Sequence, residues 1–247
     1  MPLLENIDLV LLLIVSAAGT SFVTAAMGIG GGVMLLAILA SVLPAAALIP
    51  VHGLVQLGSN GNRAIMTRQH IDWCMVKSFS AGALLGAFAA SFVVIQLPLE
   101  LIQLCVALFI LYLVWGPKPG SAQLSEKGQF LAGGGTTFIS MFVGASGPLV
   151  AGFVHRQSYD KEATTATFAA CMSVQHLLKM LVFSLVGFAF WQWLPLIILM
   201  ILGGVAGTWL GLKMLNRIPA EKFRLIFKTL VTLLALRLLW QALQTYL

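Results

Sequence analysis

The chain of 247 residues is 60% hydrophobic and only 9% charged, with a mean hydropathy of +0.99. These values exclude a soluble globular domain and predict an all-α polytopic membrane protein, because apolar stretches of about 20 residues recur along the chain. The formal net charge of +6 does not indicate nucleic-acid binding, since the basic residues lie beside apolar segments, where they set topology and contact lipid headgroups.

Glycine, proline and charged residues divide the chain into apolar segments that are all expected to be helical. The first begins next to Glu5 and Asp8 and lacks the basic start of a secretory signal, so we interpret it as part of the mature protein. The eight predicted segments cover residues 7–43, 45–66, 73–96, 99–116, 128–154, 162–188, 191–215 and 221–244.

The first segment is interrupted by glycines in the stretch GIGGG, and the fifth carries GASGP at 144–148. Glycine inside a helix costs about 1 kcal/mol relative to alanine. We expect two helix breaks near mid-membrane, where the first amides of the following helix and its positive dipole end bind an anion. The alternative is close helix packing through small residues. The amides expected to bind the anion are those near Gly30, Gly31, Gly32, Ser146 and Gly147.

The second segment carries a polar stripe. His52, Gln56 and Asn60 follow one another at four-residue spacing, which places them on one helix face. Arg63 continues the stripe near the end of the segment, where setting topology is its expected role. His52 is more often a helix-to-helix hydrogen-bond donor than a proton carrier. We expect Gln56 and Asn60, together with Gln175 of the sixth segment, to donate hydrogen bonds to the substrate. His52 is also expected at the substrate site, where it is a candidate carrier of a coupled proton.

The sixth segment carries an equivalent stripe with Gln175 and Lys179. Lys179 lies too far from either end of the segment to reach an interface easily, and a charge at mid-bilayer is costly. No acidic residue lies within another central segment, so the missing partner of Lys179 is expected to be an anionic substrate. The alternative is a lysine bonded to backbone carbonyls at a helix break. His176 lies one position off this stripe and is expected to matter less.

Two uninterrupted segments carry glycine at four-residue spacing, which favours close helix packing rather than a site. One contains Gly82 and Gly86, and the other contains Gly203, Gly207 and Gly211.

The two halves of the chain resemble each other. TSFVTAAMGIGG at 20–31 aligns with TTFISMFVGASG at 136–147, and the same alignment places Gln56 on Gln175 and Asn60 on Lys179. The sequence therefore predicts an internal repeat. Its parts are a first transmembrane repeat at 1–117, a central cytoplasmic linker at 118–127 and a second transmembrane repeat at 128–247.

The loop charges of the two halves are opposite. The loop after the second segment contains Arg68, whereas its equivalent at 188–192 contains no Lys or Arg. The positive-inside rule then places equivalent loops on opposite sides of the membrane, so the repeats are expected to be inverted. Each repeat needs an odd number of crossings, so the Gly-broken first segment is expected to form either a re-entrant hairpin or two short spans. Three transmembrane helices follow it.

The chain resembles the TauE/SafE family of bacterial sulfite and organosulfonate transporters. The resemblance rests on GIGGG and GASGP, on IDW at 71–73, and on the pair GALLGAF and GGVAGTWLG. It implies secondary transport, often export, of small sulfur-containing anions such as sulfite or sulfoacetate. It also implies a multi-pass protein of the bacterial inner membrane. From the two helix breaks and the polar stripes we expect the anion to bind between the repeats near mid-membrane, and we expect alternating access to arise from one repeat rocking against the other.

No catalytic motif, metal-ligand spacing or cofactor fingerprint is found in the sequence, so we expect no enzyme, no metal and no cofactor. The expected partners are a small anionic substrate and the lipid bilayer, with a proton or sodium as candidate coupling ion, a homodimer as candidate assembly and no nucleic acid. The alternatives are an anion channel and a membrane subunit of a larger complex.

Overall fold

The computed structural model describes residues 6–28, 30–94, 99–116 and 122–215, with isolated positions between 229 and 240. Most of the predicted segment 221–244 and part of the predicted linker at 118–127 therefore lie outside the described residues. Within the described part the chain is helical and forms no strand. The helices are α2 (Ile7–Met27), α3 (Gly31–Ala40), α4 (Ala45–Met66), α5 (Trp73–Ser91), α6 (Leu99–Trp115), α7 (Glu126–Val143), α8 (Gly147–Val154), α9 (Lys161–Leu185) and α10 (Leu194–Lys213).

Four of the described helices, α2, α5, α9 and α10, are long and apolar enough to cross a membrane. The helix α4 has a comparable length of 22 residues but carries the polar stripe. Outward-facing side chains on the long helices are large and apolar, among them Leu84, Phe88 and Trp209. Such a surface is expected where lipid rather than water surrounds the helices.

Both predicted helix breaks are confirmed. The helix α2 ends at Gly28 and α3 begins after Gly30, and these two glycines have φ angles of 86° and 107°. The second break separates α7 from α8 and begins at Gly144, whose φ is 81°. Positive φ angles are strained for residues with a Cβ atom. Glycine is therefore the residue that allows the chain to leave the helix at each of the two breaks.

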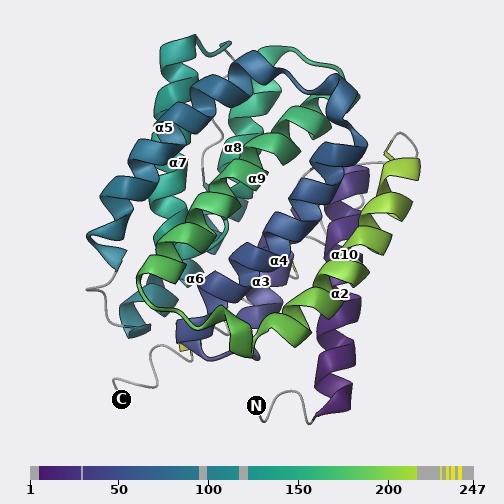
Figure 1. Cartoon of the computed structure of the whole chain (residues 1–247), viewed down its shortest axis with the longest axis vertical. Coiled ribbons are helices and arrows are strands. Elements are labelled where there is room, and N and C mark those ends of the chain that lie inside the picture. Colours follow the sequence, from purple (N-terminus) through teal and green to yellow (C-terminus); the bar gives the residue numbers. More distant parts are fainter. Residues whose placement is uncertain are drawn as a thin grey trace.

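Two pairs of helices pack with their backbones in close contact, α2 with α10 and α5 with α7 (Figure 1). A Cβ atom on Gly207 would lie 2.0 Å from the carbonyl oxygen of Ala18, and one on Gly86 would lie 2.1 Å from that of Gly134. The prediction of close packing at these glycines is confirmed, because only glycine allows so close an approach.

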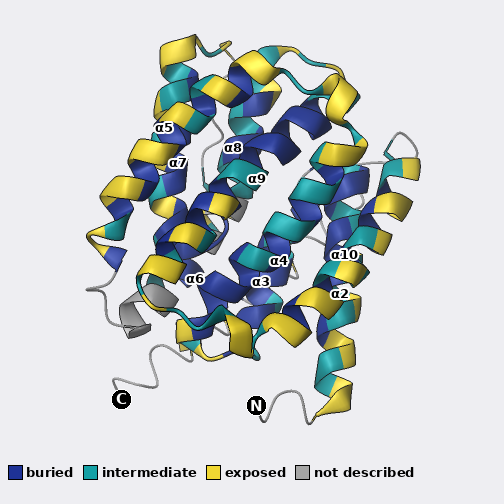
Figure 2. Cartoon of the chain, in the orientation of Figure 1, coloured by how far each residue is buried: buried dark blue, intermediate teal, exposed yellow. Residues whose placement is uncertain are grey.

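The helices α4 and α9 lie between these two pairs and pack against each other at the centre of the molecule (Figure 1). The buried residues concentrate on α4, α9 and the inward faces of the surrounding helices (Figure 2). They form two hydrophobic clusters, one built largely on α2, α3, α4 and α10 and the other on α5, α7, α8 and α9. The polar stripes of α4 and α9 meet where these two clusters adjoin.

Candidate functional site

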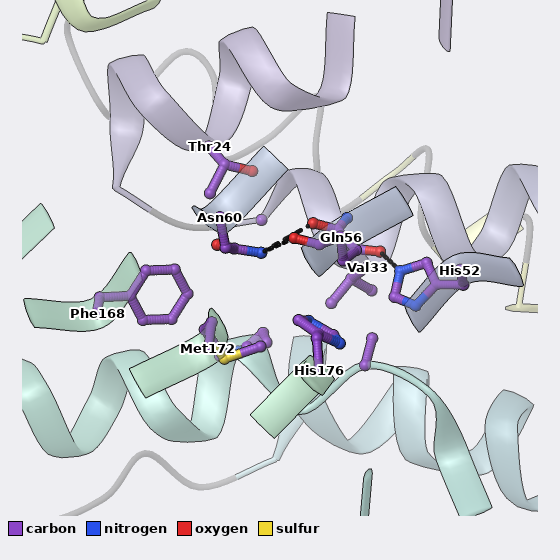
Figure 3. A pocket seen from close by; sticks show the side chains of 13 residues that line it. Thr24, Val33, His52, Gln56, Asn60, Phe168, Met172 and His176 are labelled. Carbon is purple, nitrogen blue, oxygen red and sulfur yellow. Dashed lines mark hydrogen bonds between the residues drawn. The ribbon is translucent and has the colours of Figure 1, made fainter. Parts of the chain in front are cut away.

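A small cavity lies between α4 and α9, close to both helix breaks (Figure 3). Its volume is about 20 Å³, enough for about one water molecule. Gly30 and Gly32 contribute to it from the first break, and Gly147 and Pro148 contribute from the second. The first amides of a helix have no acceptor one turn earlier in that helix. At these two helix starts the amides of Val33 and Leu149 already donate to the carbonyls of Gly30 and Ser146, and Pro148 has no amide hydrogen. The remaining first-turn amides are those of Gly31, Gly32 and Gly147.

The predicted stripe on α4 lines this cavity. His52 Nε2 lies 2.9 Å from the carbonyl oxygen of Gly32. Asn60 Nδ2 donates to the backbone oxygen of Gln56 over 2.9 Å and to its Oε1 over 3.2 Å. Gln56 also lies against the first break, since a Cβ atom on Gly32 would come within 3.2 Å of Gln56 Nε2. These contacts fix His52 and Gln56 against α3.

Gln175 and Ser146 do not line the cavity, and their direct contact with a substrate stays a prediction. Ser146 Oγ donates to Gln175 Oε1, and Gln175 Nε2 donates to the hydroxyls of Thr136 and Thr137 over 3.2 and 3.0 Å. The amide of Gln175 thus ties α9 to α7 and to the residue that precedes α8. It holds the second break in position, and its buried hydrogen-bonding atoms have partners on both sides.

Lys179 takes the alternative placement considered from the sequence. Its ammonium donates to the carbonyl oxygen of Gly144 over 2.6 Å, and the side chain is completely buried. The carbonyl belongs to the C-terminal end of α7, where a cation is favourable. Lys179 is not among the residues that line the cavity, and neither is Gly31, which packs against Thr20. Direct contacts of these two residues with a substrate remain predictions.

His176 lines the cavity together with His52, although the sequence pattern gave it less weight. The two rings meet edge to face between α9 and α4, with centroids 6.0 Å apart and planes at 75°. The Nδ1 atoms of both rings are buried and have no hydrogen-bond partner in the described part of the chain. Because the cavity lies in the seam between two crossing helices, it reaches one position beyond the stripe on α9.

The sequence did not single out the apolar part of the lining. An apolar side chain in an apolar helix carries no signal that distinguishes a cavity wall from ordinary packing, so Phe168 and Met172 could not have been found from their spacing. Figure 3 shows them opposite Asn60 and Thr24. The additional lining residues are Thr24, Val33, Ala145, Pro148, Phe168, Met172 and His176.

Arg63 is buried inside the protein, which its place near the end of the segment did not predict. Its side chain has 0% relative exposure, and its Nε, Nη1 and Nη2 atoms have no hydrogen-bond partner within the described residues. The described part of the chain contains no buried Asp or Glu. Among the residues that the structure describes, the buried cationic side chains of Arg63 and Lys179 thus have no buried acidic residue to balance them.

A second cavity, of about 210 Å³, lies where α2 ends and α9 begins. It is lined by Gly28 and by polar residues of the α8–α9 connection and the first turns of α9. These polar residues are His155, Tyr159, Lys161, Thr164 and Thr165. Partial burial lowers the pKa of His155, which favours its neutral form.

Asp72 and Tyr159 join the α4–α5 connection to the connection before α9. Partial burial alone would raise the pKa of Asp72, but the hydrogen bonds from Tyr159 and from the amides of Met75 and Cys74 outweigh it and lower that pKa. Burial and the neighbouring carboxylate raise the pKa of Tyr159. The amide of Asp72 also donates to Thr167 Oγ1 over 3.0 Å.

No group of three or more His, Cys, Asp or Glu side chains that could hold a metal ion occurs within the residues described by the structure. The three cysteines, Cys74, Cys105 and Cys171, are free.

A family model described as sulfite exporter TauE/SafE matches residues 11–238. The matched range includes both helix breaks, both polar stripes and both cavities. No curated protein and no solved structure matches the chain.

Proposed function

The chain belongs to the sulfite exporter TauE/SafE family, and on that premise we propose that it is a secondary transporter that exports small sulfur-containing anions across the bacterial inner membrane. The substrates proposed are sulfite, sulfoacetate and related organosulfonates. The observation that carries the proposal is the cavity at which the beginnings of α3 and α8 converge with polar side chains of α4.

Charge supports an anion as the ligand. Buried ionisable groups in membrane proteins generally pair with each other or face a transported ion. In the described residues the buried cations Arg63 and Lys179 face no buried acid. The N-terminal amides of the two short helices add partial positive charge at the cavity. An oxyanion that binds there would accept hydrogen bonds from the amides near Gly30–Gly32 and Gly147 and from Gln56. Asn60 Nδ2 donates to Gln56 in this conformation, so it would donate to the anion once its amide turns away from Gln56.

Helix contacts support the proposal of two inverted repeats. Each of the closely packed pairs joins one half of the chain to the other, since α2 pairs with α10 and α5 with α7. Under the sequence alignment α2 corresponds to α7 and α5 to α10, so the two pairs are equivalent. We propose that both repeats were built on one plan, with the Gly-broken segment re-entering the membrane in each. This arrangement is common among secondary transporters.

Alternating access is proposed to arise from relative motion across the α4–α9 interface. The backbone contacts between α2 and α10, and between α5 and α7, oppose sliding within each pair. We therefore propose that the two hydrophobic clusters move relative to each other as rigid bodies. Each cluster contains helices from both repeats. The cavity lies between these bodies, where a change in their angle would open it to one side and then to the other.

The test is counterflow in liposomes that contain the purified protein. Vesicles loaded with unlabelled sulfite, sulfoacetate or taurine would be diluted into buffer with the same anion carrying a ³⁵S label. Protein-free vesicles and vesicles loaded with chloride are the controls. A transporter accumulates label transiently and only when the same or a related anion is inside. An anion conductance without this exchange would indicate a channel, and no flux of any tested anion would favour a subunit of a larger complex.

A further inference from the structure

Arg63 is the most unusual group in the described structure. A guanidinium carries five donors and stays charged in proteins. That of Arg63 has 0% relative exposure, and its three nitrogens have no hydrogen-bond partner among the described residues. A buried charge left without a partner destabilises the fold. A protein that retains such a group generally uses it to meet a ligand.

The register between α4 and α9 fixes the level of Arg63 in the molecule. A Cβ atom on Gly53 would lie 2.9 Å from Lys179 Cδ, and one on Gly61 would lie 4.0 Å from Ser173 Oγ. Residue numbers on α9 therefore fall as those on α4 rise. Asn60 already shares the first cavity with Phe168. Arg63, about one turn further along α4, lies on the side of this cavity where α9 begins.

The second cavity lies in that same direction. Thr164 and Thr165 line it from α9, about one turn before Phe168. On α2 and its C-cap the first cavity is lined by Thr24 and the second by Ala26, Met27 and Gly28. A step of at most about one turn thus separates the two cavities on both helices. On α4 this step leads from Asn60 to Arg63.

The position of Arg63 on α4 also joins it to the binding stripe. Successive residues of an α-helix are rotated by about 100°, so a residue three positions after Asn60 returns to the angular sector between His52 and Gln56. Both of these side chains line the first cavity. Arg63 is not among the lining of either cavity, so its guanidinium is closed off from both in this conformation.

We propose that Arg63 is a second anion-binding station on the substrate path, between the mid-membrane cavity and the cavity at the start of α9. The proposal rests on the proposed transport function. It adds Arg63 as a substrate-binding residue and assigns it a position on the substrate path. The ligand is a small oxyanion with two or three oxygens on one centre, such as sulfite or the sulfonate group of an organosulfonate. The planar fork of a guanidinium matches two such oxygens at once. The station becomes accessible when the α4–α9 interface opens toward the second cavity.

The test compares Arg63→Met, Arg63→Lys and the control Arg68→Met in detergent and in liposomes. Arg68 is exposed on the η1 turn (Arg68–His70), just after α4. Thermal unfolding is measured without ligand and with sulfite or sulfoacetate, and counterflow gives KM and the maximal rate. Methionine keeps most of the volume of arginine and removes the unpartnered charge. Without ligand, Arg63→Met is therefore expected to unfold at or above the wild-type temperature, while the anion-induced rise in that temperature disappears and counterflow falls at least tenfold.

Arg63→Lys keeps the charge but loses the fork. It is expected to fold and transport with a KM raised at least tenfold, whereas Arg68→Met stays within twofold of wild type. The proposal is overturned if Arg63→Met retains the anion-induced stabilisation and counterflow. It is also overturned if Arg63→Met unfolds well below wild type while Arg63→Lys transports with an unchanged KM, because the guanidinium then serves only the fold. If the wild type itself neither binds nor exchanges any sulfur anion, the proposed function fails first, and the station for these anions fails with it.

Discussion

The ammonium of Lys179 donates to the carbonyl oxygen of Gly144 over 2.6 Å, and this bond joins the middle of α9 to the point where α7 ends. A fully buried cation thus sits at the negative end of a helix. Two positions after Gly144, Ser146 is held by Gln175 from the same helix α9. The whole second break is therefore positioned from α9, which places its short helix α8 beside the cavity.

The first prediction concerns Lys179→Met. This change leaves the Gly144 carbonyl without its donor inside the protein, and an unsatisfied buried carbonyl costs about 1–3 kcal/mol. The break is expected to shift, and counterflow of sulfur anions is expected to fall at least about tenfold, which corresponds to about 1.4 kcal/mol. The control is Lys213→Met. In the wild type the exposed ammonium of Lys213 lies 3.3 Å from the centroid of the Trp209 ring. Full transport by Lys179→Met would show that neither the cap nor the charge is needed.

The second prediction concerns Gln175→Met. The change removes one acceptor and two donor bonds and leaves the hydroxyls of Ser146, Thr136 and Thr137 without this partner. We expect the free energy of unfolding to fall by about 1–3 kcal/mol, together with a loss of anion-induced stabilisation. Thermal unfolding with and without sulfite measures both. Gln192→Met, at an exposed position near the start of α10, is the matched control, and equal behaviour of the two variants would contradict the network's role.

The third prediction concerns a single methyl group at Gly32. A Cβ atom there would lie 3.2 Å from Gln56 Nε2, whereas one on Gly19 meets nothing within 4 Å. Gly32→Ala is therefore expected to displace the Gln56 amide and raise the KM for the anion several-fold with little change in stability. Gly19→Ala should transport normally and gain about 0.5–1 kcal/mol, because alanine is favoured over glycine inside a helix. Counterflow and thermal unfolding of both variants test this. An unchanged KM in Gly32→Ala would remove Gln56 from the site.

The sequence predicted the features that depend on local backbone chemistry. Glycine clusters located both helix breaks, and the four-residue spacing of His52, Gln56 and Asn60 predicted their common face. The glycines of α5 and α10 predicted that these helices pack closely against a neighbour. Each of these signals follows from helix geometry or from the absence of a Cβ atom. None of them depends on knowing which helix is the neighbour.

The contacts of long side chains could not be predicted in the same way. Lys179 can reach a carbonyl or a cavity from the same backbone position, and only the packing of α7 against α9 decides between them. Arg63 lies one turn before the end of α4, where a sequence pattern predicts an interface. The connection after α4 folds back onto α9, where the amide of Asp72 bonds to Thr167. Burial of Arg63 is thus a result of tertiary packing.

The last prediction concerns the bond between Tyr159 and Asp72. Because the pKa of Asp72 is lowered in the folded protein, its contribution to stability is complete above the ordinary value of about 4 and is lost as the pH falls through the folded value. Tyr159→Phe removes one donor to this carboxylate. The variant is expected to be less stable than wild type at pH 7 by about 0.5–1.5 kcal/mol, the usual contribution of one hydrogen bond.

The difference between the two proteins should narrow as the pH falls below about 4, because protonation removes the charge that the tyrosine hydroxyl stabilises in the wild type. Thermal unfolding of both in detergent between pH 3 and pH 8 gives this difference directly, and acid effects common to both proteins cancel. Tyr112→Phe, at an exposed tyrosine of α6, controls for the loss of a hydroxyl elsewhere. A difference that stays constant over the whole range would mean that Tyr159 does not act through the Asp72 carboxylate, and a difference that widens in acid would reverse the sign of the argument.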